Sequence, residues 1–377
     1  MARLLARTAG HAIGWLQVRR PTGIEPVQGT SPHPRPPGVR RIRAQRAMPR
    51  ALLIAPQWIG DAVMAQPLVA MLAARGEHVA ALALPTIAPV LRAMPGVTEV
   101  IEAPFGHGRV DFAARWRVAT TLRARGYARA YILGNNVKAR LVPWLARIPV
   151  RIGYAGEASG LLLTRKYHAQ NGGGRTDMRE RYAKLAGVDC GAALAEPTLH
   201  VDPGVAAQAR ARFGLPPRWV AVCPGAEYGP AKQWPAEHYG ALALRAQRDG
   251  YAVAVLGAPS DARTGEAIAS LAPHVMNLCG RTQLDEAIAL LAGASGVVSN
   301  DSGLMHVAAA LRRPTLGIYG STDPRHTPPA AHHSATLWLH LPCSPCFARA
   351  CPLGHLNCLR GIQPEMAWAA LGGLMHD

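Results

Sequence analysis

Two features are absent from this sequence of 377 residues, and a third is scarce. No uninterrupted apolar run reaches about 18 residues, which argues against a transmembrane helix. The first 47 residues lack an apolar core long enough for secretion, so the seven cysteines are expected as reduced thiols or metal ligands, not disulfides. Acidic residues are scarce, with 23 Asp and Glu against 41 Lys and Arg, and such a basic chain suits an anionic partner.

The first 47 residues differ in composition from the rest. They hold nine Arg and one acidic residue, Glu25, and their prolines cluster between positions 32 and 37. Such a segment buries too little surface to offset chain entropy, so we predict disorder over 1–47. Two interpretations stay open. The segment is either a basic arm for nucleic acid or anionic lipid, or non-native sequence from an upstream start assignment, since Met48 directly precedes the first expected strand.

The remaining chain has a globular composition, since 49% of all residues are apolar and the length suffices for two domains. Short apolar runs alternate with stretches of helical periodicity, which predicts parallel, doubly wound α/β sheets. We expect two Rossmann-like domains, 48–202 and 203–362, followed by a C-terminal helix over 363–377. No close sequence repeat relates the two domains.

The expected strands of the first domain are 51–55, 78–84, 99–101 and 130–133, and its helices are 61–75, 86–93, 112–125, 137–147 and 178–185. In the second domain the strands are 219–223, 251–257, 275–278, 296–299, 314–319 and 336–341, and the helices are 236–248, 262–271, 284–291, 304–311 and 364–374. Ligands of open α/β sheets bind beyond the carboxyl ends of the strands. We therefore expect a ligand cleft where the two domains face each other.

The stretch 297–319 organises the second domain, with the pattern of a strand, a polar loop, a helix and another strand. Free amides at a helix start near Ser302 and Gly303 favour an anionic group such as a diphosphate, and His306 follows within one turn. From these residues alone a second interpretation stays open. Asp301 and Ser302 are also typical of an ordinary helix cap, and His306 of a buried core histidine.

Two further loops follow strands at the same sheet edges. The first presents Asp61, either as part of the chemistry expected at this edge or as the N-cap of the next helix. The second, 224–234, is rich in Gly and Pro and offers one cation, Lys232, for a phosphate or for solvent. Trp58 and Trp234 flank these loops, where packing is the expected role and stacking on a sugar the alternative.

Four cysteines lie close together near the C-terminus, as Cys343-x2-Cys346-x4-Cys351-x6-Cys358, with His355 in the last interval. They supply enough sulfur ligands for a zinc ion. The spacing departs from standard zinc-finger patterns, because its second half lacks a close Cys-x2-Cys pair. We therefore expect packed thiols and no metal, with a structural zinc ion as the alternative.

Four segments together resemble glycosyltransferase family 9. They are Gly-Asp at 60–61, Pro-Gly-Ala-Glu-Tyr-Gly-Pro-Ala-Lys-Gln-Trp-Pro at 224–235, Ser-Asn-Asp-Ser-Gly-Leu-Met-His-Val-Ala-Ala-Ala-Leu at 299–311, and Tyr-Gly-Ser-Thr-Asp-Pro at 319–324. The resemblance extends from about Pro49 to the C-terminus. It implies a GT-B fold and inverting transfer of heptose from ADP-L-glycero-β-D-manno-heptose to the first heptose of the lipopolysaccharide inner core.

The resemblance leaves two alternatives. The stretch 227–232 favours members of the family that add the second heptose, but a member that adds the first or a later heptose is not excluded. A protein of this fold can also bind a nucleotide or glycan without catalysis. The presence of Asp61 together with Lys232 weighs against lost activity.

The resemblance also implies roles for single residues. Asp61 corresponds to the general base. The donor-binding positions are Lys232, Asp301, Ser302, Gly303 and His306, with Asp261 as a candidate for the adenosine ribose where related members often carry Glu. The candidate acceptor-binding residues are Lys138, Arg140, Arg151 and Arg165, joined by Lys166.

The same resemblance implies the partners and the place of action. The donor is ADP-heptose and the acceptor is a phosphorylated heptosyl-Kdo-lipid A, with no cofactor, divalent metal or nucleic acid required. Because this acceptor is embedded in a membrane leaflet, we expect a cytoplasmic protein in peripheral contact with the inner face of the cytoplasmic membrane.

Overall fold

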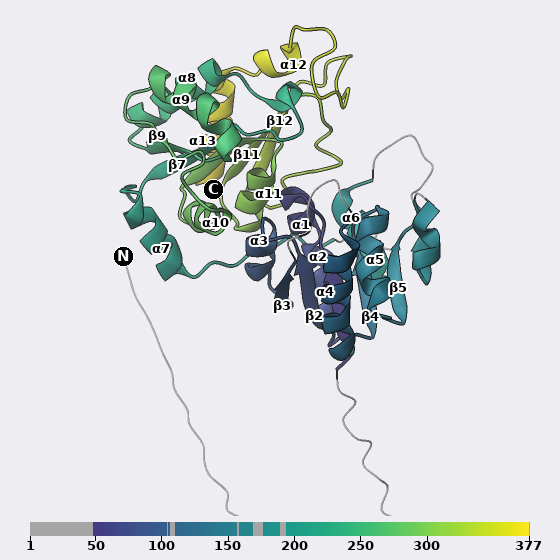
Figure 1. Ribbon diagram of the computed structural model, residues 1–377. Coiled ribbons are helices and arrows are strands. Elements are labelled where there is room, and N and C mark those ends of the chain that lie inside the picture. Colours follow the sequence, from purple (N-terminus) through teal and green to yellow (C-terminus); the bar gives the residue numbers. More distant parts are fainter. Residues whose placement is uncertain are drawn as a thin grey trace, which may run out of the picture. The chain divides into compact units, whose positions relative to one another are not determined.

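The computed structural model describes residues 48–103, 105, 110–156, 158–168, 176–188 and 194–376. The predicted disorder of 1–47 and the state of Cys190 lie outside these ranges. Within them the chain forms two six-stranded sheets, and the strands of each sheet are all parallel (Figure 1). The predicted α/β class with two doubly wound sheets is confirmed.

The first sheet has the strand order β3-β2-β1-β4-β5-β6. Its strands are β1 (Arg50–Ile54), β2 (His78–Ala83), β3 (Val97–Glu102), β4 (Arg129–Ile132), β5 (Val150–Tyr154) and β6 (Arg165–Tyr167). Successive side chains of a strand point to opposite faces, so Leu53 and Leu52 belong to two different apolar layers. Both faces of this sheet must therefore be covered.

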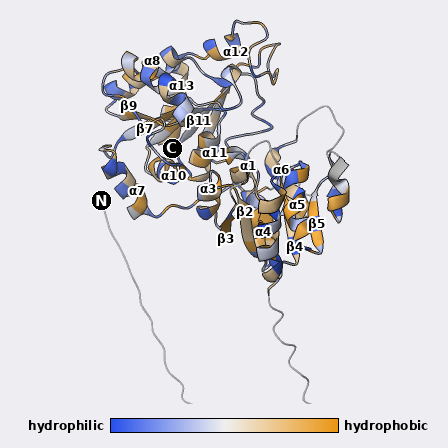
Figure 2. Ribbon diagram, in the orientation of Figure 1, coloured by the Kyte–Doolittle hydropathy of each residue, from blue (hydrophilic) through white to orange (hydrophobic). Residues whose placement is uncertain are grey.

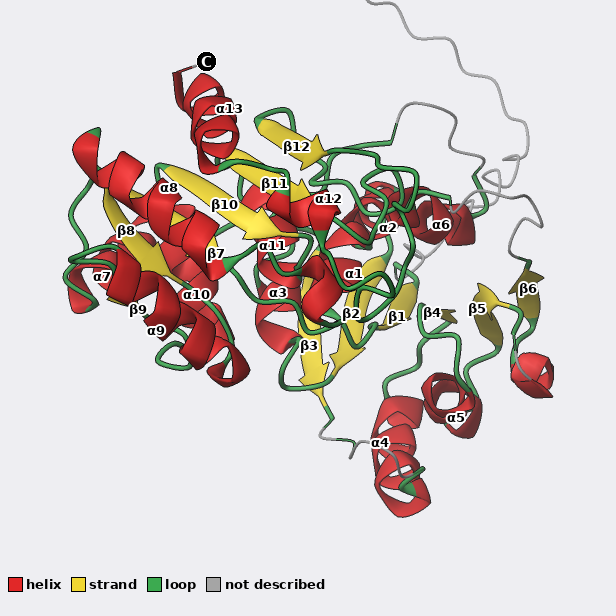
Figure 3. Ribbon diagram, turned by 90° about the horizontal axis from the view of Figure 1, so that it is seen from above, coloured by secondary structure: helices red, strands yellow, loops and turns green. Residues whose placement is uncertain are grey.

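Helices cover both faces of the first sheet. Ala119, Leu122 and Val142 of α4 and α5 pack against Leu52 and Ile54 on one face. Figure 3 shows α4 and α5 together on one side of these strands, and α5 is mostly orange, that is hydrophobic, in Figure 2. The helices of this half are α1 (Ile59–Met64), α2 (Gln66–Ala74), α3 (Ala88–Arg92), α4 (Phe112–Ala124), α5 (Val137–Leu145), the short 3-10 helix η1 (Ala158–Leu162) and α6 (Met178–Ala183).

The second sheet has the order β12-β11-β10-β7-β8-β9. Its strands are β7 (Trp219–Cys223), β8 (Ala252–Val255), β9 (Met276–Asn277), β10 (Gly296–Asn300), β11 (Thr315–Tyr319) and β12 (Ser334–Trp338). Its helices are α7 (Pro203–Arg212), α8 (Ala236–Arg248), α9 (Ala262–Leu271), α10 (Leu284–Ala292), α11 (Gly303–Ala310), α12 (Asn357–Arg360) and α13 (Pro364–His376). The C-terminal helix α13 packs on this sheet beside α8, with Trp368 and Leu371 in the shared apolar layer.

One apolar cluster joins the two halves. It contains Leu68 of α2 and Leu91 of α3 together with Leu290 of α10 and Val307 of α11. Helix α1 packs against α11, and α3 packs against α10. The helices that follow β1 and β10 are thereby held against each other. Within the described ranges, no helix combines the length and apolarity needed to span a bilayer.

Strands β5 and β6 and helix α7 are among the elements that the sequence pattern did not predict. The three-residue β6 carries two charged side chains, and β5 contains Arg151 and Gly153, so neither has a clear strand pattern. They form because a neighbouring strand supplies their hydrogen bonds. Helix α7 has an ordinary start signal, with Asp202 as N-cap and Pro203 in the first position, but it begins at the predicted domain boundary.

The helix predicted over 61–75 is two helices. Its first part begins two residues earlier, at Ile59, and ends at Met64. Ala65 separates it from α2, in which Pro67 occupies the first turn. Proline is tolerated at a helix start and disrupts a helix interior, so the chain restarts here instead of continuing.

Candidate active site

The loops with the predicted site residues leave the sheets where the strand order reverses. In the first sheet β1 lies between β2 and β4, and in the second β7 lies between β8 and β10. These switch points are the usual ligand positions of open α/β sheets. Helix α1, which carries Asp61, follows β1, and α11 follows β10. Because α1 and α11 pack against each other, the structure brings the two predicted site segments together.

Asp61 is partly buried in the first turn of α1. The N-cap of this helix is Trp58, so the alternative role of Asp61 as the N-cap is wrong. Burial raises the pKa of Asp61 from its usual 3.8 to about 6, while the charges of Lys232 and Arg181 oppose the rise and that of Asp301 adds to it. A carboxylate with such a pKa is a stronger base than an exposed aspartate and is still largely ionised at neutral pH.

Lys232 and Asp301 form a buried ion pair. The Nζ of Lys232 donates to Asp301 Oδ2 over 2.6 Å and lies 3.4 Å from the main-chain oxygen of the same residue. The two side chains are 15% and 4% exposed. Thr322 Oγ1 donates to the same Oδ2 over 2.6 Å. Asp301 thereby orients the Lys232 side chain. Since an ammonium group has three N–H donors, one of them stays available to a ligand.

The start of α11 has the features of an anion site. Ser302 occupies the N-cap, but its side chain does not cap the helix and its Oγ lies 3.1 Å from Ser299 Oγ instead. Within the described chain, the structure records no hydrogen bond from the amides of Ser302 and Gly303. The alternative of an ordinary serine cap is wrong. Unpaired amides at a helix start carry partial positive charge, so anion binding here stays a supported prediction.

His306 lies in the contact between α1 and α11. Its ring is buried, and a Cβ added to Gly60 would come within 2.7 Å of its Cδ2. Burial lowers the pKa of His306 to about 4, against the charge of Asp301, so the ring is neutral at pH 7. The interpretation as a buried core histidine is confirmed. A direct contact of His306 with a donor stays a prediction.

We expect Gly303→Ala to destabilise the protein. The added Cβ would lie 2.7 Å from the Cβ of Ile59, well inside the about 3.5–4.0 Å of a normal carbon contact. A Cβ cannot rotate away, so α1 and α11 must separate, and the free energy of unfolding should fall by about 1–3 kcal/mol. Denaturant unfolding measures this. The control is Gly372→Ala on α13, where no atom lies within 4 Å of the new methyl group. An unchanged midpoint for Gly303→Ala contradicts the close packing.

Asp261 lies at the ends of β7 and β8. Its Oδ2 accepts a hydrogen bond from the Ala258 amide over 2.8 Å, and a Cβ added to Gly225 would come within 2.5 Å of the same oxygen. Burial raises the pKa of Asp261, and the charge of Glu227 adds to this rise. The carboxylate thus fastens its own loop beside the 224–234 loop. Its contact with a ribose stays a prediction.

The two tryptophans beside the site differ in their surroundings. Trp234 is 1% exposed and its Nε1 donates to the Ile362 carbonyl over 2.9 Å, so its packing role is confirmed. Trp58 is 55% exposed, and packing is the wrong interpretation for it. It stands three residues before Asp61, and its stacking on a sugar stays a prediction.

Two of the arginines predicted for the acceptor bind main-chain carbonyls. Arg140 is 1% exposed and donates through Nη2 to Tyr154 over 2.9 Å and through Nη1 to Gly156 over 2.8 Å. Arg151 donates to the carbonyls of Leu162 and Ile148 over 2.7 and 2.6 Å. The Arg140 guanidinium braces the first domain from inside, so its position gives no support to a surface contact with an acceptor. Arg151 is only partly buried, and its contact with an acceptor stays a prediction.

A pocket of about 230 Å³ opens at the switch point of the first sheet. Ile54, Leu82 and Val142 supply apolar walls from β1, β2 and α5. The polar and charged side chains of its described lining are Gln57, Arg115, Asn136 and Lys138. Of the predicted acceptor residues, this lining includes Lys138, whereas Arg165 and Lys166 are exposed on β6.

The four C-terminal cysteines have the geometry of free thiols. In the described ranges, no three His, Cys, Asp or Glu side chains are arranged to hold a metal ion. Cys346 is exposed, whereas Cys358 is buried, which raises its pKa. The alternative of a structural zinc ion therefore gains no support from the geometry.

Three residues of these sites were missed from the sequence. Thr322 bonds Asp301, and its position in the segment 319–324 after a strand was a usable signal. Arg115 also had a signal, because it shares the core-facing side of α4 with Ala119 and Leu122 and is 5% exposed. Arg181, whose charge lowers the pKa of Asp61, had none, since nothing in the sequence separates it from its charged neighbours on α6.

Comparison with known proteins gives the family. The model of glycosyltransferase family 9 (heptosyltransferase) matches residues 115–357. Lipopolysaccharide heptosyltransferase 2 of Escherichia coli K12 is 38% identical over 307 residues, which cover 77% of this chain and 88% of that protein. Lipooligosaccharide heptosyltransferase 2 of Haemophilus influenzae is 36% identical over 308 residues, covering 76% and 88%.

A solved structure agrees. The structure of the E. coli ADP-heptose lipopolysaccharide heptosyltransferase II superposes with a TM-score of 0.77 at 34% identity, covering 87% of this chain and 98% of that one. The two parallel α/β sheets and the match to this structure give the chain the GT-B fold of a glycosyltransferase. The chain belongs to glycosyltransferase family 9, and the predicted resemblance to this family is confirmed.

Proposed function

We propose that this protein is an inverting heptosyltransferase, which moves heptose from ADP-L-glycero-β-D-manno-heptose to the first heptose of the lipopolysaccharide inner core. Its membership of family 9 and its relatives named heptosyltransferase 2 support this activity. One observation carries the chemistry. The carboxyl group of Asp61, with its pKa raised to about 6, meets the charge of Lys232 where α1 and α11 pack together.

Asp61 acts as the general base of the proposed reaction. As the acceptor hydroxyl oxygen forms its bond to the anomeric carbon, its proton passes to the Asp61 carboxylate. The bond from that carbon to the ADP oxygen breaks on the opposite face, which inverts the configuration. The raised pKa suits this role, because the protonated product is stable enough to form and the base is still mainly ionised at pH 7.

Lys232 and the start of α11 stabilise the departing ADP. Negative charge grows on the diphosphate as the bond breaks, and preorganised donors aimed at that charge lower the barrier. The donors are the N–H of Lys232 not directed at Asp301 and the amides of Ser302 and Gly303. Asp301 positions Lys232, and Asp261 reaches the ribose edge of the donor. We propose that these groups suffice without a divalent metal.

The two halves divide the substrates between them. We assign the acceptor to the domain 48–202 and ADP-heptose to the domain 203–362. Lys138 in the pocket lining and the exposed Arg165 and Lys166 support this assignment, because basic side chains attract an anionic acceptor. Because heptosyl-Kdo-lipid A is anchored by its acyl chains, the reaction takes place at the inner face of the cytoplasmic membrane, where the protein binds peripherally.

The test is whether the full-length protein transfers heptose from ADP-heptose to the acceptor. Purified protein, ADP-heptose and the mono-heptosylated acceptor should give an acceptor heavier by one heptose in mass spectra. Activity should persist in EDTA if the protein's own donors stabilise ADP, whereas loss in EDTA with rescue by Mg²⁺ would show a metal requirement. Absence of transfer to this acceptor, with transfer to an acceptor lacking heptose, would contradict the assignment to the second heptose.

A further inference from the structure

We propose that the pocket at the switch point of the first sheet recognises an anionic substituent of the acceptor, and that Arg115 determines this specificity. The substituent is a phosphomonoester or a sugar-acid carboxylate, which share the planar array of oxygen acceptors that a guanidinium group binds. The inference rests on the proposed function, because it describes how the acceptor of that reaction is held.

Arg115 is buried but keeps one end directed at the pocket. It is 5% exposed, its Nε donates to the Val110 carbonyl over 2.5 Å and its Nη1 donates to the Lys138 carbonyl over 2.9 Å. In the described chain, Nη2 has no recorded partner and is not among the fully buried unpaired atoms. Because Arg115 lines the pocket, we infer that these remaining N–H groups are the ones directed into it.

Arg140 shows how a buried arginine with a purely structural role differs from Arg115. Arg140 is also buried, but both Nη1 and Nη2 donate to carbonyls, and it does not belong to the described pocket lining. Arg115 is fixed from one side and stacks its guanidinium 4.1 Å above the Phe105 ring. A side chain held in this way loses little entropy on binding and presents the N–H donors of its planar guanidinium group in one orientation.

The charge balance of the pocket favours an anion. Arg115 and Lys138 are its cations, and the described lining contains no acidic residue. Burial lowers the pKa of Arg115, against the charge of Asp111, so its guanidinium is poorly hydrated. An anionic oxygen replaces the missing water at a lower desolvation cost than at an exposed arginine.

The position and size of the pocket suit an acceptor sugar. Gln57 in its lining belongs to the loop between β1 and α1, four residues before Asp61. An acceptor anchored here therefore lies next to the loop that leads to the proposed base. Its volume of about 230 Å³ is well above what a single bound water needs, so the pocket has room for a substituent of the acceptor.

The test compares three acceptors with the full-length protein. They are the native mono-heptosylated acceptor, a phosphatase-treated form and a form with methyl-esterified carboxylates. For the wild type, kcat/KM should fall by about tenfold to a hundredfold for whichever form lacks the recognised group, as expected for a lost charge-assisted hydrogen bond. The form that loses rate identifies the group as phosphate or carboxylate.

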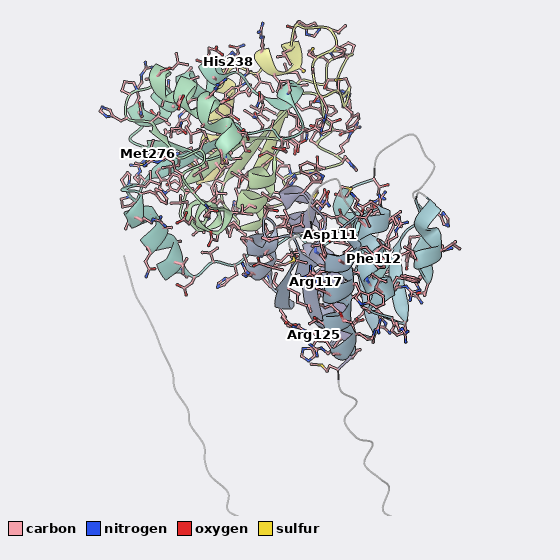
Figure 4. All side chains as sticks on the ribbon, viewed as in Figure 1. Asp111, Phe112, Arg117, Arg125, His238 and Met276 are labelled. Atoms are coloured by element: carbon pink, nitrogen blue, oxygen red, sulfur yellow. The ribbon has the colours of Figure 1, made fainter. Side chains whose placement is uncertain are left out.

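Arg115→Met should remove this preference. The native and modified acceptors should then react within about twofold of each other, while the KM for ADP-heptose stays at its wild-type value. Arg115→Lys should restore part of the preference, because it keeps the charge but not the fork. The control is Arg117→Gln, an exposed arginine on the same helix (Figure 4), which should keep the full wild-type preference.

Two further measurements cover the other outcomes. If Arg115→Met fails to fold, Lys138→Met, which removes the second cation from the rim, should reduce the preference instead. Equilibrium binding of the same three acceptors without donor reports on the pocket even if no heptose is transferred, which would overturn only the proposed function. The proposal is overturned if both variants discriminate among the acceptors as strongly as the wild type.

Discussion

Asp61→Asn should reduce kcat of heptose transfer by about 10²–10⁴-fold, the usual contribution of a general base. The amide has nearly the shape of the carboxylate but cannot accept the proton of the acceptor hydroxyl. Asp61 lies in the first turn of α1, where the charge of Lys232 acts on it, but it does not cap the helix. The substitution should therefore leave the fold intact. Initial rates at saturating donor and acceptor measure the effect.

The pH dependence gives the same substitution a second signature. With a pKa of about 6, Asp61 is protonated at pH 5 and ionised at pH 7, so wild-type kcat/KM should rise across this interval. The residual activity of Asp61→Asn should lack the rise. Asp202→Asn is the matched control, since Asp202 only caps α7 and asparagine caps equally well. Near-normal turnover by Asp61→Asn would disprove the assignment of the base.

As the pH rises through the pKa of Asp61, the free energy of unfolding should fall while the activity rises. The folded-state pKa of Asp61, about 6, lies above its usual 3.8, so between these values the native state holds a proton that the unfolded state has lost. Its contribution to stability therefore falls as pH rises through that window, by about 3 kcal/mol in all at about 1.4 kcal/mol per pKa unit. Asp61→Asn should accordingly be more stable than the wild type at pH 8, and this difference should vanish once the pH falls below the usual pKa of 3.8.

Much of the donor side could be predicted because its chemistry lies in continuous segments. Ser302 and Gly303 follow a strand directly, and parallel topology places the end of that strand at a ligand edge. The proximity of Lys232 to Asp301 could not be obtained from local pattern, because it depends on the lateral pairing of β7 with β10. The sequence supplied the residues, and the sheet order brought them into contact.

The acceptor side was harder to predict for a physical reason. Basic residues were selected as surface charges, yet Arg140 and Arg151 turned out to bind carbonyls of their own domain. Arginine does this readily because its long side chain carries several donors, and a one-dimensional pattern does not distinguish this use from ligand binding. Arg115 was overlooked, although a charged residue on the buried side of α4 needs a reason to be buried.

Lys232→Met is expected to damage both stability and turnover. It removes the ammonium that balances Asp301, whose carboxylate is 4% exposed and is left with hydroxyl partners such as Thr322. Breaking a buried ion pair from one side costs about 3–5 kcal/mol, because the remaining charge stays desolvated. The departing diphosphate also loses its cation, so kcat should fall by about 10²–10³-fold, as for other lost donors to a developing anion. Denaturant unfolding and initial rates measure the two effects.

The double variant Lys232→Met/Asp301→Asn separates these two effects. Its neutral amide needs no counter-charge and still accepts from Thr322, so most of the lost stability should return. Turnover should stay low, because no cation remains for the diphosphate. As a control, Lys184→Met breaks a pair with Glu180 on α6 and should cost only about 0.5 kcal/mol, the usual value for a pair one helical turn apart. If the double variant regained activity with stability, Lys232 would be a structural residue and the cation for ADP would have to come from elsewhere.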